Sequence, residues 1–273
     1  MKAKKVLFIT QEISPYVTDS TISNLGRKLP QSIQDGGREI RTFLPKWGNI
    51  NERRNQLHEV IRLSGMNIII DDTDHPLIIK VASLQSARIQ IYFIDNDDYF
   101  QKREMAFDAM GNEYTDNAER AVFYARGVLE TVKKLRWCPD VIHCHGWISA
   151  AAPLYIKKAY KDEPPFRDAK VVFSLYDEEL KQPLGQNIKN CLAFRDANKK
   201  LLDEQKLDFK SPEDLLKLAI NFSDGVVQGC ENVNPTLLEY AKSQNKPILE
   251  YQEGENYTET YGSFYDLVAG SNE

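Results

Sequence analysis

Residues 139–149 constrain the fold of this chain more than any other stretch. They read Pro-Asp-Val-Ile-His-Cys-His-Gly-Trp-Ile-Ser, a short apolar run that ends in two histidines, a glycine and a tryptophan. Such a run is typical of a buried strand in an α/β sheet. His143 and His145 are two residues apart, so a strand places both rings on one face and Cys144 on the other. Because ligands of open α/β sheets bind at the carboxyl ends of strands, the segment predicts a site as well as a fold.

Strand-like and helix-like segments alternate along the chain, which predicts βαβ units and a mainly parallel sheet. An apolar run at residues 6–9 is followed by a helical pattern at 23–32, which a Gly-Gly pair stops. The same reasoning predicts strands at residues 39–44, 170–175, 224–228 and 247–250. It predicts helices at residues 117–134, 215–220 and 235–242. The fold class is therefore α/β and Rossmann-like, with helices flanking the sheet.

Three segments depart from this alternation. Residues 59–94 hold four apolar runs, the first at 60–63, which form either an inserted meander or strands that flank the main sheet. Residues 177–213 have weak apolar periodicity and many charges, which predicts a surface excursion with short helices. The polar end of the chain, rich in Tyr and Gly, predicts a loose or docked segment. We therefore predict one Rossmann-like domain over residues 1–252 and a polar tail or linker over 253–273.

Composition narrows the functional classes. The 273 residues are 42% hydrophobic and 27% charged, as in globular proteins, and the net charge of −5 disfavours a nucleic-acid binder. The first apolar run has four residues, whereas a secretion signal needs about 7 to 15. No run approaches the roughly 18 apolar residues of a membrane span. We expect a cytoplasmic protein with neither a nucleic-acid nor a membrane partner.

The histidine pair allows two interpretations. An H-x-H pair on a strand can present two imidazoles to one metal ion, but zinc needs a further protein ligand. The other histidines, His58 and His75, lie in the irregular stretch of strands. We therefore expect no metal and no cofactor. We interpret His143 as a buried ring hydrogen-bonded to backbone and His145 as a ligand-facing group at the strand end.

A second polar cluster opens the long helix predicted at residues 117–134. Asp116 is a good N-cap residue, which is a sufficient reason for its presence. Asn117 and Arg120 are three residues apart, so they can project together and offer hydrogen bonds to a polyhydroxylated ligand such as a sugar. Both interpretations stay open. By contrast, the loop over residues 14–25 has no glycine, which weakens any prediction of a phosphate-cradling loop there.

Several motifs, in this order, resemble the N-terminal half of bacterial glycogen synthases and starch synthases. These are ADP-glucose-dependent enzymes of glycosyltransferase family 5 with the GT-B fold, and the likeness runs from Val6 to about Glu250. The motifs lie at residues 11–15 (Gln-Glu-Ile-Ser-Pro), 43–48 (Phe-Leu-Pro-Lys-Trp-Gly), 91–96 (Ile-Tyr-Phe-Ile-Asp-Asn), 99–100 (Tyr-Phe), 114–120 (Tyr-Thr-Asp-Asn-Ala-Glu-Arg) and 139–147. The resemblance implies half of a GT-B glycosyltransferase as the fold.

The resemblance also assigns roles to single positions. It implies that His145 contacts the transferred glucose, and its retained motifs imply that the substrate-binding residues are His145, Asp116, Asn117, Arg120 and Trp147. The family's lysine and paired glycines in the donor loop are replaced by Thr18, Ser20 and Thr21. An aspartate and a histidine of the family are replaced by Gly146 and Ile148, and the motif after the next strand is altered over residues 174–177. The sugar side of the site is thus better preserved than the donor side.

GT-B enzymes close a second domain over the donor, and its charged groups stabilise the leaving diphosphate. No sequence matching that C-terminal half is found up to Glu273. We therefore expect a glycogen/starch-synthase-like protein of α-glucan metabolism, degenerate, inefficient alone and with no catalytic residue. Its ligand is α-glucan, a related sugar or a protein partner. The alternative is an active ADP-glucose-dependent α-1,4-glucan glucosyltransferase that a second chain completes; a third possibility is a structural remnant.

Overall fold

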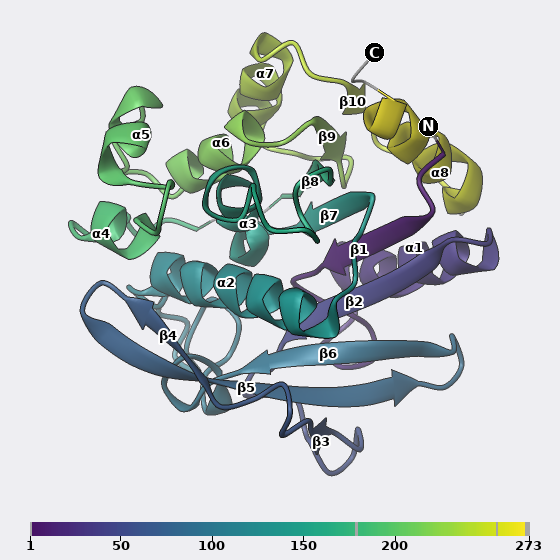
Figure 1. Cartoon of the computed structure of the whole chain (residues 1–273), viewed down its shortest axis with the longest axis horizontal. Coiled ribbons are helices and arrows are strands. Elements are labelled where there is room, and N and C mark those ends of the chain that lie inside the picture. Colours follow the sequence, from purple (N-terminus) through teal and green to yellow (C-terminus); the bar gives the residue numbers. More distant parts are fainter. Residues whose placement is uncertain (1, 178–179, 255, 271–273) are drawn as a thin grey trace.

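A ten-stranded, mostly parallel sheet organises the chain (Figure 1). The computed structural model describes residues 2–177, 180–254 and 256–270. The strands are β1 (Lys5–Ile9), β2 (Glu39–Pro45), β3 (His58–Glu59), β4 (Met66–Ile70), β5 (Thr73–Leu84), β6 (Ile89–Asp95), β7 (Val141–His145), β8 (Lys170–Leu175), β9 (Gly225–Gln228) and β10 (Ile248–Leu249). The helices are α1 (Thr21–Asp35), α2 (Asn117–Leu135), α3 (Ala152–Leu154), α4 (Ile188–Leu192), α5 (Lys199–Glu204), α6 (Glu213–Asn221), α7 (Pro235–Ser243) and α8 (Tyr257–Gly270).

The strand order is β10-β9-β8-β7-β1-β2-β6-β5-β3, with β4 paired to β5. All pairs from β10 to β6 are parallel, whereas β5 runs antiparallel to β6, β4 and β3. The strands within residues 59–94 therefore extend and flank the main sheet. The strand predicted at residues 60–63 is wrong, because a short strand at His58–Glu59 is followed there by turns.

The central strands are apolar because helices cover both of their faces. β7 is buried throughout and β1 is buried except at its first residue. The helix α1 packs on this sheet through Leu25, Leu29 and Ile33, which are spaced by four and buried. It begins after Ser20, whose side chain accepts a hydrogen bond from the backbone of Ser23.

The helices divide between the two faces. Helix α1 contacts α8 and β2, while α2, α3, α6 and α7 form a chain of contacts elsewhere (Figure 1). The long helix α2 confirms the prediction made for residues 117–134. The predicted surface excursion contains α4 and α5, as expected; residues 178–179 lie outside the described part of the chain. No helix of the described residues is long and apolar enough to cross a membrane.

The prediction of a polar tail over residues 253–273 is wrong for α8. Within this helix Tyr261, Phe264, Tyr265 and Val268 are buried, and they follow a spacing of three and four along one face. The helix lies beside α1 and close to the first strand (Figure 1). Tyr and Gly made this segment look polar, but a tyrosine ring buries apolar area while its hydroxyl keeps a hydrogen bond. Residues 257–270 therefore belong to the same core as the sheet.

Candidate functional site

A cavity of about 450 Å³ lies beyond the carboxyl ends of β1, β8, β9 and β10, and the segments that follow these strands line it. The carboxyl edge of a parallel sheet is the usual ligand site of such folds. The cavity is lined by Gln11, Glu12, Ser20, Thr21, Ile22, Tyr176, Asp177, Cys230, Glu231, Asn232 and Tyr251.

The histidines of β7 lie on one face, as the strand spacing predicts. Their ring centroids are 3.8 Å apart, and both side chains are buried. The ring of His143 is bonded to hydroxyl groups, with Nδ1 2.7 Å from Tyr265 and Nε2 2.7 Å from Ser174. The prediction that His143 is a buried ring is confirmed, but its partners are side chains and not backbone. One of them comes from α8, the helix that composition did not reveal.

His145 contributes to the site through a neighbour. Its Nδ1 lies 2.7 Å from the hydroxyl of Tyr176, which lines the cavity, whereas its Nε2 has no hydrogen-bond partner within the described chain. The side-chain oxygen of Gln11 is also buried without a partner among the described residues. Buried polar atoms are nearly always bonded. Of the two residues, only Gln11 lines the cavity; His145 reaches it through Tyr176.

Burial sets the protonation of these rings. It lowers the pKa of His145 to about 3 and lowers the pKa of His143 well below its ordinary value. Both rings are therefore neutral at physiological pH. A neutral imidazole has one donor and one acceptor nitrogen, which suits a sugar hydroxyl better than a phosphate.

Replacing His145 with glutamine is expected to flatten the dependence of stability on pH. Below the ordinary histidine pKa the unfolded chain binds a proton at this position and the folded chain does not, so stability falls as pH falls. The slope per histidine approaches about 1.4 kcal/mol per pH unit. Urea unfolding between pH 6 and pH 5 should show a slope smaller by about 1 kcal/mol per pH unit in the variant. The exposed His58→Gln serves as control, and an unchanged slope in His145→Gln would contradict burial of a neutral ring.

Gly146 fits a tight turn that brings Gln11 against β7. Its φ is +78°, and a Cβ atom at this position would lie 2.4 Å from the side-chain oxygen of Gln11. A side chain at this position would therefore need a positive φ and a shift of the Gln11 side chain.

The altered donor loop now supports the start of α1. Ser20 caps the helix and also donates a hydrogen bond of 2.5 Å to the carboxylate of Glu12. Thr21 lines the cavity. Both Thr21 and Thr18 are exposed. The positive end of the helix dipole, where a nucleotide phosphate is favoured, thus lies beside a carboxylate of the chain itself.

The charged residues that line the cavity in the described structure are all acidic. Three of its lining residues are acids, Glu12, Asp177 and Glu231, and none of those lining it in the described structure is Lys or Arg. A pyrophosphate group needs cations or free backbone N–H groups. The arrangement therefore favours neutral or cationic ligands.

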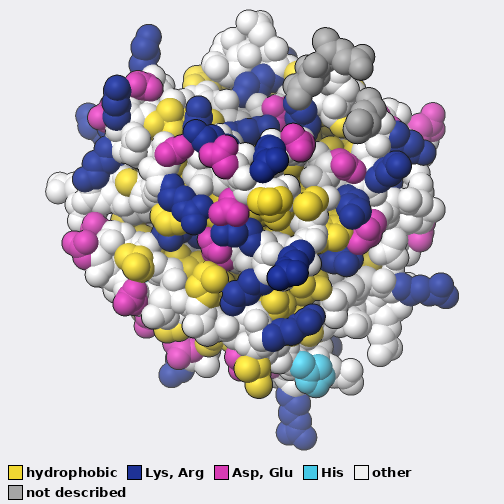
Figure 2. Space-filling view, in the orientation of Figure 1, with side chains coloured by type: hydrophobic (Ala, Val, Ile, Leu, Met, Phe, Trp, Pro, Cys, Tyr) yellow, Lys and Arg dark blue, Asp and Glu magenta, His cyan; other side chains and the backbone are white. Residues whose placement is uncertain are grey.

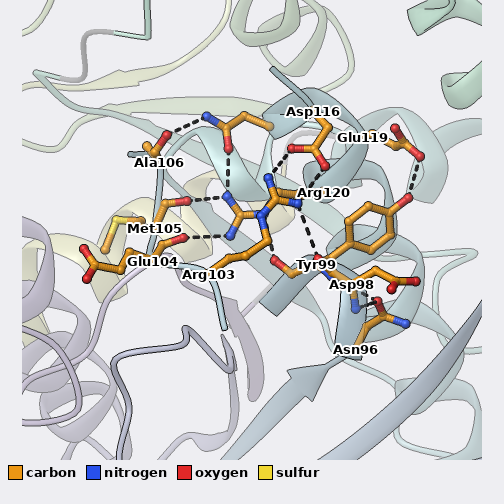
Figure 3. A network of polar contacts seen from close by, with 11 residues as sticks. Asn96, Asp98, Tyr99, Arg103, Glu104, Met105, Ala106, Asp116, Glu119 and Arg120 are labelled. Atoms are coloured by element: carbon orange, nitrogen blue, oxygen red, sulfur yellow. Dashed lines mark hydrogen bonds and ion pairs between the residues drawn. The ribbon is translucent and has the colours of Figure 1, made fainter. Parts of the chain in front are cut away.

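The cluster at the start of α2 has internal partners (Figure 3). Arg120 is fully buried and donates to the carbonyl groups of residues 99, 104 and 105 and to the side chain of Asn117. Asp116 occupies the N-cap position but makes no capping bond; it forms two hydrogen bonds with the guanidinium of Arg103. The prediction of Asp116 as the N-cap residue is confirmed in position, but its carboxylate accepts hydrogen bonds from Arg103 and not from the helix backbone. The substrate-binding roles of Asp116, Asn117 and Arg120 stay predictions, and these bonds show them holding the 103–106 segment.

Trp147 lies at a different hollow. Its ring is buried and lines a cavity of about 290 Å³ together with residues of α6 and α7. A narrow hollow of about 20 Å³ joins Trp147 with Asn117. The structure thus brings these two predicted residues together, while His145 adjoins the larger cavity through Tyr176. The substrate-binding roles of Trp147 and His145 also stay predictions.

Sequence reasoning missed Gln11, Tyr176 and Tyr251 as site residues. Each follows the carboxyl end of a strand, at positions where parallel sheets collect ligand-binding groups. Their position after a strand was the signal that could have identified them. Residues 174–177 were compared only with the family's motif, so Tyr176 was not considered as a site residue. The described residues contain no group of three His, Cys, Asp or Glu side chains that could hold a metal ion.

Comparison with known proteins decides the family. The model of the starch synthase catalytic domain matches residues 5–237. This chain belongs to the starch synthase catalytic domain family. The glycogen synthases of Chlorobium luteolum and Chlorobium chlorochromatii are 37% and 38% identical to this family member over 174 residues. That segment is 63% of the chain and 36% of each relative, so the chain spans about a third of the curated relatives' length.

Solved structures give the same fold. The catalytic domain of starch synthase IV from Arabidopsis thaliana, bound to ADP and acarbose, matches with a TM-score of 0.69 at 16% sequence identity. The match covers 92% of this chain and 52% of that structure. The predicted Rossmann-like domain of GT-B type is therefore confirmed, and so is the resemblance to the catalytic domain of glycogen and starch synthases.

Proposed function

We propose that this starch-synthase-family domain binds a neutral α-glucan or related sugar in the 450 Å³ cavity, and that it does not transfer glucose efficiently from ADP-glucose alone. The observation that carries the proposal is the charge of that cavity. Three carboxylates line it, with no Lys or Arg in its described lining. Such a lining accepts hydrogen bonds from sugar hydroxyl groups and repels a diphosphate.

The repulsion is large enough to decide between donor and glucan. Two like charges 4 Å apart interact by about 4 kcal/mol at the effective dielectric of a protein surface. A diphosphate beside Glu12, Asp177 and Glu231 meets this repulsion without the lysine that the family supplies at position 18. Starch synthase IV was solved with ADP and acarbose; in the present chain we propose that the nucleotide side of such a site is lost.

A second hollow extends the site. It measures about 260 Å³, shares Thr21 and Tyr251 with the main cavity, and adds Lys28 and the rings of Tyr257 and Tyr261. Tyrosine presents a broad apolar face together with a hydroxyl group, which suits a sugar ring that has apolar and polar faces. Two joined hollows favour an oligosaccharide over a single sugar.

Replacing His145 with alanine is expected to weaken glucan binding about tenfold, because Tyr176 loses the hydrogen bond that positions it, which is worth about 1.4 kcal/mol. Isothermal titration calorimetry with maltoheptaose measures the change, and a glycogen pull-down gives a second readout. His58→Ala, at an exposed histidine, is the matched control. Absence of affinity in both wild type and variant would refute glucan binding. Equal, measurable affinity of the two proteins would show that His145 does not contribute to it.

The alternative remains an active glucosyltransferase completed by a second chain. It predicts incorporation of labelled glucose from ADP-glucose into glycogen only when a chain carrying the C-terminal half is added. The acidic cavity argues against it. Robust turnover by the purified chain, or by the mixture, would overturn the proposed loss of donor binding while leaving the calorimetric test of glucan binding intact.

A further inference from the structure

A cavity of about 490 Å³ lies between β4, the middle of α2 and the segment after α4. It shares no lining residue with the sugar site. Figure 2 shows the face that α2 and β4 form, where basic side chains lie among hydrophobic ones. The feature of interest is Arg126, which projects from α2 into the wall of this cavity and whose side chain is more than nine-tenths buried.

The guanidinium of Arg126 is only partly used by the protein. Its Nη1 donates to the carbonyl group of Ile69, and its plane lies 3.9 Å from the ring centre of Phe194. Its Nε is buried with no hydrogen-bond partner in the described chain, and its Nη2 forms none there either. No carboxylate lies within ion-pair distance of it among the residues that the structure describes.

The two free nitrogens lie on the same edge of the guanidinium. Their N–H groups are parallel and spaced to grip two oxygens of one carboxylate or phosphate. A buried cation without an anion is unfavourable, because burial removes its hydration and one carbonyl group and one aromatic ring replace only part of it. Phe194 holds the plane of the group in place and prevents it from reaching solvent by rotation. The geometry is that of a prepared anion site.

The other charged groups around this cavity do not pair with Arg126. Lys133 and Arg195 also line the cavity, but both pair with Glu163, at 2.9 and 3.1 Å. Glu130 accepts a hydrogen bond of 2.7 Å from Tyr160 and also lies near Lys133. None of these groups pairs with Arg126, and neither does Asp71, the other carboxylate of the lining.

We propose that Arg126 anchors the oxyanion, a phosphate or a carboxylate, of a small organic molecule bound in this cavity. The volume exceeds that of the anion alone, so the ligand has a neutral remainder that contacts the apolar wall around Phe194. The site is separate from the glucan cavity and its test does not depend on the proposed function. Inorganic phosphate and acetate, titrated separately into the full chain at constant ionic strength, distinguish the two anions.

A ligand that binds only the folded chain raises its melting temperature. We expect a saturable rise with one of the two anions in wild type, and at least tenfold weaker binding in Arg126→Gln. Arg126→Lys keeps the charge but loses the two-pronged grip, so it should restore only part of the affinity. The exposed Arg62→Gln is the matched control and should bind as wild type does.

A second measurement tests the site even if Arg126→Gln does not fold. The NMR signal of the Arg126 Nε–H group in the wild-type chain should shift as the anion is added, and Lys133→Gln, which leaves Arg126 in place, should weaken binding about threefold. A saturable shift at Arg126 supports the site. No saturable effect of either anion in wild type, or equal affinity in Arg126→Gln, would overturn it.

Discussion

Replacing Arg38 with methionine is expected to lower the free energy of unfolding by about 2 kcal/mol, because the loss removes charge-assisted hydrogen bonds of a buried guanidinium, while its partner Asp266 is one-third exposed and regains water. Arg38 is 8% exposed and joins three parts of the chain. It donates to the carbonyl groups of Ala3 and Gly262, at 2.6 and 3.0 Å. It also forms two hydrogen bonds with Asp266 of α8, at 2.8 and 2.9 Å. Urea unfolding followed by circular dichroism measures the loss.

The half-buried neighbour Arg41 provides the control for this prediction. Its ion pair with Glu39 spans 3.4 Å at the surface, and such pairs contribute at most about 1 kcal/mol. Arg41→Met should therefore stay within that range. The double variant with Asp266→Asn should lose less than the sum of the single variants, since both act on one interaction. Equal losses in Arg38→Met and Arg41→Met would mean that α8 is not held by this pair.

Replacing Gly26 with alanine should destabilise the protein by about 3 kcal/mol, the upper end of typical overpacking penalties. Helix propensity alone predicts the opposite sign, a gain of up to about 1 kcal/mol inside α1. A Cβ at this position would lie 2.1 Å from the backbone oxygen of Glu12. The backbone cannot give way there without moving the loop that lines the sugar cavity, so maltoheptaose binding should weaken as well.

Gly185→Ala is the matched control, because a Cβ at that position meets no atom within 4 Å. It should change the unfolding free energy by less than about 0.5 kcal/mol, as surface substitutions usually do. Thermal unfolding and calorimetry on the two variants make the comparison. A Gly26→Ala protein that matches or exceeds wild-type stability would show that α1 and the loop after β1 are not in close contact.

The βαβ frame was predictable because its residues repeat a simple pattern. The strands around His143 are buried on both faces and read as unbroken apolar runs, and α1 and α2 keep helical spacing. Helix α8 was missed because its three tyrosine and two glycine residues mask its apolar face. The turn at residues 60–63 was missed because short apolar runs read alike in strands and turns.

The site was predictable only in part. The spacing of His143 and His145 fixed the face they share. The sequence did not predict that Asp116 would bond to Arg103 or that Arg120 would bond to the backbone of the residues that follow Arg103. Those bonds join residues whose proximity depends on loop geometry. Nor did it predict that Tyr176 would stand between His145 and the cavity, since that depends on how β8 ends.

The hydrogen bond between His143 and Tyr265 connects positions 122 residues apart. A ribosome makes the chain from its N-terminus, so β7 emerges long before its partner on α8. Until α8 has been synthesised, Nδ1 of His143 lacks the hydroxyl group of Tyr265, and water or a chaperone must supply its hydrogen bond or cover it. A shortened gene that stops at residue 252 would make that interim state permanent, and we expect its product to aggregate or be degraded during synthesis.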